Sequence, residues 1–131
     1  VLEHVTELNP TIQQLKNILD KDGTMFIAVP NLNSTDAKKY KEHWAAYDVP
    51  RHLWHFSRQT MKKILTNHSL KITDIIPMPL DAYYVSLLSE KYRRKSNGLS
   101  VMANAIIQGW RSNHEVKSTG EYSSLIYVVR K

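Results

Sequence analysis

The side chains best suited to chemistry gather in one polar and aromatic stretch, residues 32–56, which we call the lid. It contains three histidines, His43, His52 and His55. An imidazole with a pKa near neutrality can remove a proton from a hydroxyl or an amine, so we predict that His52 is the catalytic residue. The alternative is that His52 only hydrogen-bonds backbone groups and shapes the lid. We predict no metal site, because the lid has no Cys and no carboxylates at an obvious ligand spacing.

The lid is also the natural place for a substrate, since ordered loops of this length in compact domains are usually functional. We expect Leu53, Trp54 and Phe56 to anchor it to a sheet while Arg51 and His52 face a cleft. The predicted substrate-binding residues in and next to the lid are Asn31, Trp44, Tyr47, Asp48, Arg51 and His55.

The elements that must position these residues alternate between helix and strand. Asn9 as N-cap and Pro10 in the first turn predict a helix, and the apolar run 24–29 is typical of a strand buried on both faces. A short helix is expected over 36–44. Ser57 is expected to cap a further helix, which a strand over 71–76 follows. Strand-helix-strand units make parallel sheets, so the predicted fold class is α/β.

The remainder of the chain predicts two helices, 81–95 and 99–110, and a final strand over 122–129. Tyr83 and Tyr84 on the first of these helices are predicted substrate-side residues. Three strands leave an uncovered sheet edge beside Met25–Val29. We therefore expect a homo-oligomer that forms through this edge.

The composition excludes some classes of protein and leaves others open. The 131 residues suit one domain, and no apolar run approaches the ~20 residues of a membrane span. The chain has no Cys, which suits a cytoplasmic location. Its four glycines are isolated from one another, which excludes a glycine-rich phosphate cradle. The net charge of +6 keeps open a non-catalytic basic module that binds an anionic partner, although the basic residues are scattered and we expect no nucleic-acid binding.

Four phrases, in order, resemble the class I S-adenosylmethionine-dependent methyltransferases of the methyltransferase-23 type, which are related to the ubiquinone-pathway O-methyltransferases. The phrases are Val1-Leu-Glu-His-Val5, Leu19-Asp-Lys-Asp-Gly23, Met25-Phe-Ile-Ala-Val-Pro-Asn31 and Asp48-Val-Pro-Arg-His-Leu-Trp-His-Phe-Ser57. The turn before Gly23 departs mildly from the family's Pro-Gly-Gly-like turn. The resemblance is good from residue 1 to about 76 and weak over 77–120.

The resemblance implies part of a Rossmann-like methyltransferase sheet, its fifth, sixth and seventh strands in the order 5-7-6, with the last strand antiparallel. Residues 1–131 would be the C-terminal part of the domain, with a helical insertion at 77–120, and the cofactor-binding half would precede Val1. The implied activity is methyl transfer from S-adenosylmethionine to a small-molecule, lipid or saccharide-precursor acceptor. We expect the isolated chain to bind that cofactor negligibly and to be inactive.

The resemblance also places Glu3 and His4 just after the fourth strand, on the cofactor side, and so implies that they bind the cofactor. In the ubiquinone-type relatives a Glu-x-x-Glu-His phrase has been associated with magnesium, and Glu3-His4 matches its last two positions. The alternative is a carboxylate and an imidazole that fix the start of the next helix.

Overall fold

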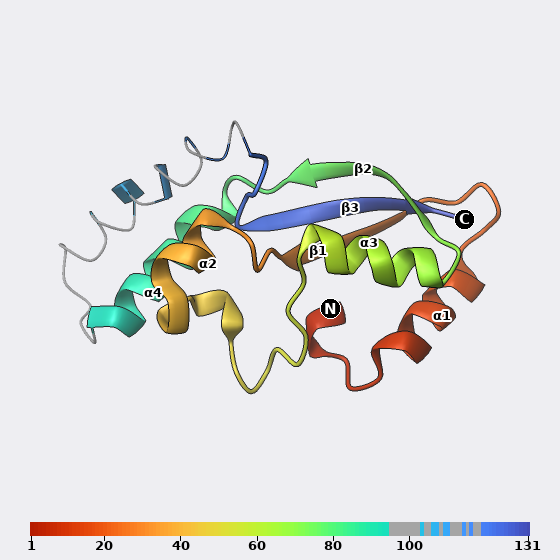
Figure 1. Ribbon diagram of the computed structural model, residues 1–131, viewed down its shortest axis with the longest axis horizontal. Coiled ribbons are helices and arrows are strands. Elements are labelled where there is room, and N and C mark those ends of the chain that lie inside the picture. Colours follow the sequence, from red (N-terminus) through yellow and green to blue (C-terminus); the bar gives the residue numbers. More distant parts are fainter. Residues whose placement is uncertain (95–102, 104–105, 108, 111–113, 115, 117–118) are drawn as a thin grey trace.

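A three-stranded antiparallel sheet forms the centre of the computed structural model, which describes residues 1–94, 103, 106–107, 109–110, 114, 116 and 119–131. The strands are β1 (Met25–Pro30), β2 (Lys71–Pro77) and β3 (Ser124–Arg130), in the order β1-β3-β2. Both outer strands pair with β3 in antiparallel fashion. β1 and β2 therefore run in the same direction but are not neighbours, because β3 lies between them (Figure 1). This arrangement fits the predicted α/β class.

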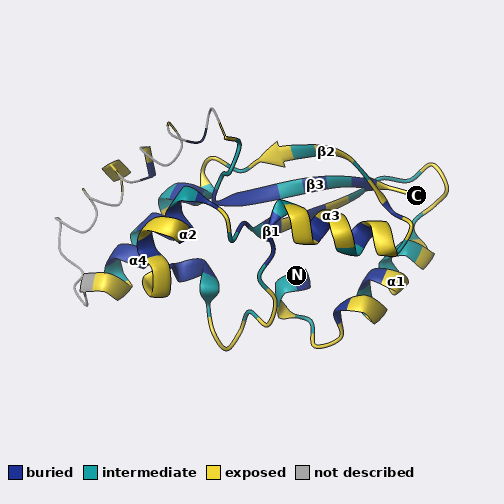
Figure 2. Ribbon diagram, viewed as in Figure 1, coloured by how far each residue is buried: buried dark blue, intermediate teal, exposed yellow. Residues whose placement is uncertain are grey.

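Two helices cover one face of this sheet, α1 (Leu8–Ile18) and α3 (Arg58–Asn67). Their buried sides face the strands and their outer sides are exposed (Figure 2). Alternate residues of a strand share a face, and a buried cluster joins both helices to such alternate positions. Its members are Leu2, Leu8, Ile12, Ile27, Val29, Phe56, Met61, Leu65, Leu70, Leu125, Tyr127 and Val129.

The helix starts follow the capping rules with one correction. The Ser57 side chain accepts a hydrogen bond from the backbone N–H of Thr60, and the Thr60 hydroxyl accepts one from Ser57 N–H, which is a capping box. The prediction that Asn9 caps α1 is wrong, because Glu7 is the N-cap residue. Asn9 and Pro10 lie within the first turn, where backbone N–H groups have no intrahelical partner and proline is tolerated.

β1 corrects a second expectation, that both of its faces are buried. Ile27 and Val29 are buried, whereas Phe26 is 65% exposed and Ala28 is also exposed. The helices α1 and α3 cover the face that carries Ile27 and Val29, and the residues described here leave the opposite side of β1 open. The side chains of this continuous apolar run are therefore alternately exposed and buried over residues 26–29.

The lid and α4 (Asp81–Arg94) form a second layer at one end of the sheet (Figure 1). The expected helix over 36–44 is a shorter α2 (Thr35–Tyr40) followed by two 3₁₀ turns, η2 (Lys41–His43) and η3 (Ala45–Tyr47). Lys41 ends α2 with a φ of 47°. α2 and these turns pack on α4 through the buried residues Ala37, Tyr40, Trp44, Ala46 and Val85.

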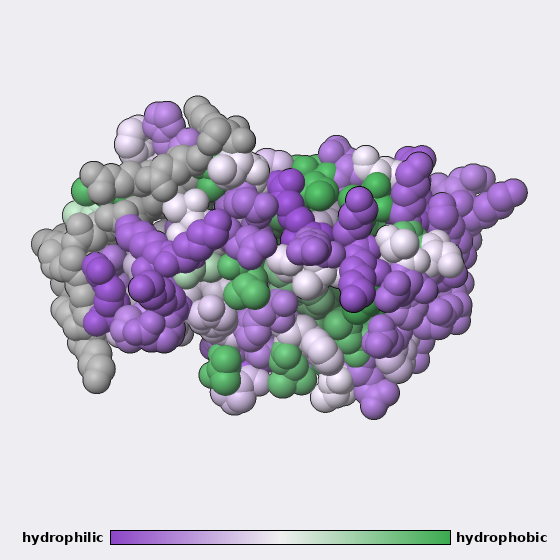
Figure 3. All heavy atoms as spheres, in the orientation of Figure 1, coloured by the Kyte–Doolittle hydropathy of each residue, from purple (hydrophilic) through white to green (hydrophobic). Residues whose placement is uncertain are grey.

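The predicted 81–95 helix is confirmed as α4, while the expected helix over 99–110 lies largely outside the described residues. Among the residues that are described, no helix has both the length and the apolar character needed to cross a membrane. On the face shown in Figure 3, hydrophilic side chains predominate and hydrophobic ones form small separate patches.

Candidate functional site

The C-terminal part of the lid is joined to the start of the chain by hydrogen bonds. The backbone N–H groups of Leu53 and Trp54 donate to the carbonyl oxygen of Glu3, at 2.7 and 3.2 Å. The indole Nε1 of Trp54 donates to the carbonyl oxygen of Val5 at 2.7 Å. These bonds bring the 3₁₀ turn η1 (Leu2–His4) against residues 51–54, so that Glu3 and His4 lie beside the lid histidines.

The lid is held to the sheet differently from the sequence-based expectation. Phe56 is buried in the core, and the backbone N–H of Leu32 donates to its carbonyl oxygen at 2.7 Å, so this anchor is confirmed. Leu53 is 49% exposed and Trp54 is 39% exposed. The prediction is wrong for these two residues, because the N-terminal turn, and not the sheet, is their partner.

His52 is oriented by a backbone carbonyl. Its Nδ1 lies 2.8 Å from the carbonyl oxygen of Ala46, and its side chain is 12% exposed. A carbonyl oxygen can only accept a hydrogen bond, so Nδ1 carries the proton and Nε2 of the neutral ring has a lone pair. This Nε2 is 3.8 Å from Oδ2 of Asp48. The ring is therefore fixed in the tautomer that can receive a proton.

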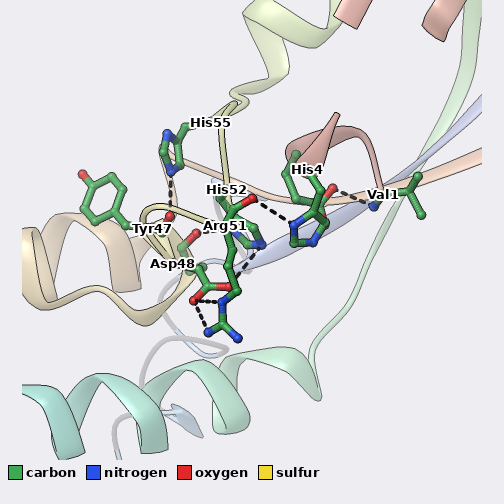
Figure 4. A network of polar contacts seen from close by, with 9 residues as sticks. Val1, His4, Tyr47, Asp48, Arg51, His52 and His55 are labelled. Atoms are coloured by element: carbon green, nitrogen blue, oxygen red, sulfur yellow. Dashed lines mark hydrogen bonds and ion pairs between the residues drawn. The ribbon is translucent and has the colours of Figure 1, made fainter. Parts of the chain in front are cut away.

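His4 repeats this arrangement next to it. Its Nδ1 lies 3.0 Å from the carbonyl oxygen of Arg51, and its Nε2 is 3.7 Å from Oε1 of Glu3. The His4 and His52 rings meet edge to face with their centroids 4.6 Å apart (Figure 4). The two imidazoles thus form a pair, with the carboxylate of Glu3 beside His4 and that of Asp48 beside His52.

The Glu3 carboxylate is partly buried. Its Oε2 lies 2.8 Å from the nitrogen of Val1. Glu3, His4 and His52 each offer a potential ligand atom, and these atoms lie within 4.8 Å of one another. Among the described residues, no other group of three or more His, Cys, Asp or Glu side chains brings its ligand atoms this close together.

Asp48 and Arg51 form the polar side of the neighbouring cavity. Asp48 follows η3 with a φ of 41°, and its Oδ1 accepts hydrogen bonds from Nε and Nη2 of Arg51 (Figure 4). The hydrogen bond to Asp48 raises the pKa of the Arg51 guanidinium. Asp48 therefore lies between two cationic or potentially cationic groups, the Arg51 guanidinium and the His52 imidazole.

A cavity of about 280 Å³ lies between η3 and α4, beside the residues through which the two elements pack. Arg51 and His52 line it, as the sequence led us to expect. Its complete lining is Pro30, Ala45, Ala46, Asp48, Arg51, His52, Asp81, Tyr84, Val85, Leu88 and Tyr92. An apolar lining with a few converging polar groups is typical of a site for a small organic molecule.

The other predicted substrate residues lie elsewhere. Asn31 is buried, and its Nδ2 donates to Oε2 of Glu121 at 2.6 Å and to the carbonyl oxygen of Tyr122 at 3.1 Å. Trp44 is 2% exposed within the second core. Neither side chain lines the cavity, so the contacts of both residues hold the lid in place.

Tyr47, His55 and Tyr83 are also absent from the lining of this cavity. Tyr47 lines a separate hollow, and its carbonyl oxygen is 3.0 Å from Nε2 of His55. Tyr83 packs against Gly109, where an added Cβ would come within 2.6 Å of the ring. Of the two adjacent tyrosines, only Tyr84 reaches the cavity.

α4 contributes more residues to the cavity than the predicted Tyr84. Asp81, Val85, Leu88 and Tyr92 line the cavity from one side of this helix. Their spacing of three or four residues is the helical repeat, and it was the signal that could have found them. The sequence did not show which face of the helix would meet the lid.

A family model described as a methyltransferase domain matches residues 1–75. Among curated proteins, none matches the chain. The matched range includes η1, β1, the whole lid and α3, and thus Glu3, His4 and His52, whereas the α4 wall of the cavity lies beyond it.

Proposed function

The chain belongs to the methyltransferase domain family, and we propose that it serves the transfer of a methyl group from S-adenosylmethionine to an acceptor held between η3 and α4. Pro30, the last residue of β1, is part of the cavity lining. Ligands of open α/β sheets bind beyond the carboxyl ends of the strands, and this position supports the proposal. The acceptor is a small molecule, a lipid or a saccharide precursor that places its nucleophile in this cavity.

The observation that carries the proposal is the orientation of His52. S-adenosylmethionine supplies an electrophilic methyl group when it is bound. Nε2 of His52, with its lone pair, receives the proton that the acceptor loses as its O, N or C atom bonds to the methyl carbon and the sulfur leaves with the electrons of the broken bond. The hydrogen bond to Ala46 keeps the ring in the required tautomer.

The remaining residues position the two substrates. Asp48 and Arg51 offer polar contacts to the acceptor, and Tyr84 and Leu88 contact its apolar part. Glu3 and His4, beside His52, are proposed cofactor contacts. The glycines of the chain are isolated from one another, so we place the main cofactor contacts outside residues 1–131. On this proposal, β1, β3 and β2 correspond to the fifth, seventh and sixth strands of a methyltransferase sheet, and residues 77–120 form a helical insertion.

Filling the cavity tests this location. We expect Leu88→Trp to lower kcat/KM of the full-length enzyme about 10-fold or more, because the indole occupies space that the acceptor needs. The affinity for S-adenosylmethionine should not change. The assay is transfer of a labelled methyl group to the small molecules of a cell extract.

Ile76→Trp is the matched control, since Ile76 is partly exposed on β2 and lies outside the cavity lining. Equal kcat/KM in wild type and Leu88→Trp would show that the acceptor binds elsewhere.

We also propose that the chain self-associates through β1. The outer edge of β1 has no strand partner among the described residues, and exposed Phe26 lies in a hollow of about 440 Å³ with Leu15 and Met25. In sedimentation equilibrium of residues 1–131 alone we expect dimers, and Phe26→Lys should weaken them about 10-fold or more because a Phe side chain loses its burial. Ile18→Lys, an exposed position outside this hollow, is the control. Monomers at high concentration would contradict the proposal.

One observation favours a second function, a basic module for an anionic partner. A hollow of about 780 Å³ between α3 and β2 is lined by Arg58, Lys62 and Lys71, and no carboxylate is among its lining residues. If this is the function, Lys62→Glu abolishes binding of the anionic partner, and His52→Ala does not change that binding. If methyl transfer is the function, His52→Ala lowers the turnover about 10²–10⁴-fold and Lys62→Glu leaves it unchanged.

A further inference from the structure

Two hydrogen-bond acceptors face each other in the cavity between η3 and α4, one on His52 and one on Asp48 (Figure 4). Nδ1 of His52 carries the proton that bonds to the Ala46 carbonyl oxygen, so Nε2 has a lone pair. Oδ1 of Asp48 accepts hydrogen bonds from Nε and Nη2 of Arg51, and Oδ2 faces His52. Nε2 and Oδ2 are 3.8 Å apart, and no described residue donates a hydrogen bond to either atom.

The number of donors on the acceptor's nucleophile decides whether it can satisfy both atoms. The side chains of His52 and Asp48 are only 12% and 22% exposed, and buried polar atoms are usually hydrogen-bonded. One nitrogen can lie about 2.9 Å from Nε2 and from Oδ2 at the same time. A primary amine has at least two N–H groups and can donate to both, whereas a hydroxyl has a single O–H. The pair therefore favours nitrogen over oxygen as the nucleophile.

The charge of the cavity lining favours a cation. With neutral His52, the side chains of Asp48, Asp81 and Arg51 give the lining one net negative charge, although the chain as a whole carries +6. Tyr84 and Tyr92 also line the cavity, and the faces of aromatic rings attract cations. Aliphatic amines are protonated at neutral pH, so this lining attracts them before they react.

We propose that the acceptor is a primary amine and that its nitrogen is the atom that is methylated. The ammonium group donates one hydrogen bond to Oδ2 of Asp48 and gives a second proton to Nε2 of His52. The lone pair that this leaves on nitrogen bonds to the methyl carbon, while the electrons of the carbon–sulfur bond stay on sulfur. The products are a methylammonium group, S-adenosylhomocysteine and the His52 imidazolium. This inference rests on the proposed function, because it names the atom that receives the methyl group.

The experiment offers the full-length enzyme and labelled S-adenosylmethionine two samples of the small molecules from one cell extract. One sample is treated with N-acetoxysuccinimide, which acetylates amines in preference to alcohols, and the other with the hydrolysed reagent. We expect acetylation to lower label transfer about 10-fold or more, because an amide nitrogen lacks the positive charge and the second N–H. Mass spectrometry of the labelled product should place the methyl group on nitrogen.

Two failures of this experiment are distinguishable. Transfer that survives acetylation, or a product methylated on oxygen or carbon, would overturn the inference and leave the proposed function standing. Absence of transfer to the sample with intact amines would contradict the proposed function itself. The wild-type protein suffices for both readings, so neither depends on the folding of a variant.

Asp48→Asn tests the contact on this chain. Asn tolerates the φ of 41° at this position, and its amide oxygen can accept the hydrogen bonds from Arg51. The amide N–H₂ then replaces Oδ2, and it can neither accept a hydrogen bond from the amine nor attract its charge. We expect KM for the amine to rise about 10-fold or more, the usual effect of losing a hydrogen bond to a charged group. The affinity for S-adenosylmethionine should stay within about twofold of wild type.

Asp22→Asn is the matched control, because Asp22 is exposed in the turn before β1 and lies outside the cavity lining. It removes the same charge, and its KM for the amine should equal that of wild type. Thermal melting checks that both variants are folded. A wild-type KM in folded Asp48→Asn, or an equal rise in Asp22→Asn, would overturn the assignment of Asp48 as the amine's partner.

Discussion

Replacement of His52 by alanine is expected to lower the turnover of the full-length methyltransferase by about 10²–10⁴-fold, the usual contribution of a general base. The variant lacks the Nε2 that receives the acceptor's proton. Its affinity for S-adenosylmethionine should stay within about twofold of wild type, because the loss lies in the proton transfer. Initial rates with labelled cofactor give turnover, and calorimetry gives the affinity.

His52→Asn separates the base from the structural alternative. Its amide N–H can replace Nδ1–H in the hydrogen bond to the Ala46 carbonyl oxygen, but it has no counterpart of Nε2. We expect His52→Asn to be as slow as His52→Ala, and His43→Ala to retain wild-type turnover. Recovery of activity in His52→Asn would mean that His52 only shapes the lid.

Trp44→Ala is expected to lower the free energy of unfolding by about 3–5 kcal/mol, because it leaves a large cavity in a buried cluster. The Trp44 ring packs with Tyr40 and Val85, and so joins the lid to α4. The loss should also loosen η3, whose Ala46 carbonyl oxygen orients His52. Urea denaturation gives the change in stability, and hydrogen exchange of the amides of residues 45–47 reports on η3.

Trp54→Ala is the control of the same residue type. Trp54 is partly exposed, and its side chain makes a hydrogen bond to the Val5 carbonyl oxygen. We expect a loss of about 1 kcal/mol, the usual net contribution of one hydrogen bond. If the two variants lost the same free energy of unfolding, Trp44 would not be the tryptophan that holds the lid.

Helix caps and the spacing of apolar residues predicted the helices correctly where both signals lie within a few neighbouring residues. Ser57 caps α3, and Met61 and Leu65, four residues apart, face the core, because caps and helical spacing are written in neighbouring residues. The apolar run at β1 predicted a strand but not its surroundings. Hydrophobicity does not reveal which layers will cover a strand, and so the exposure of Phe26 was missed.

The site depended on contacts that no local pattern contains. His4 and His52 are brought together by hydrogen bonds of η1 with the lid, and sequence spacing carries no trace of these bonds. Tyr83 and Tyr84 show a second limit. Tyr84 lies on the same face of α4 as Asp81 and Leu88, which also line the cavity, whereas Tyr83 packs against Gly109 and is outside the lining.

The most direct test of acceptor activation by His52 is a crystal structure of the full-length enzyme with S-adenosylhomocysteine and its acceptor. The quantity to measure is the distance from Nε2 of His52 to the nucleophilic atom of the acceptor. We predict about 2.6–3.2 Å, with the acceptor lying between η3 and α4. An acceptor bound outside this cavity, or one whose nucleophile points away from His52, would contradict the proposed function.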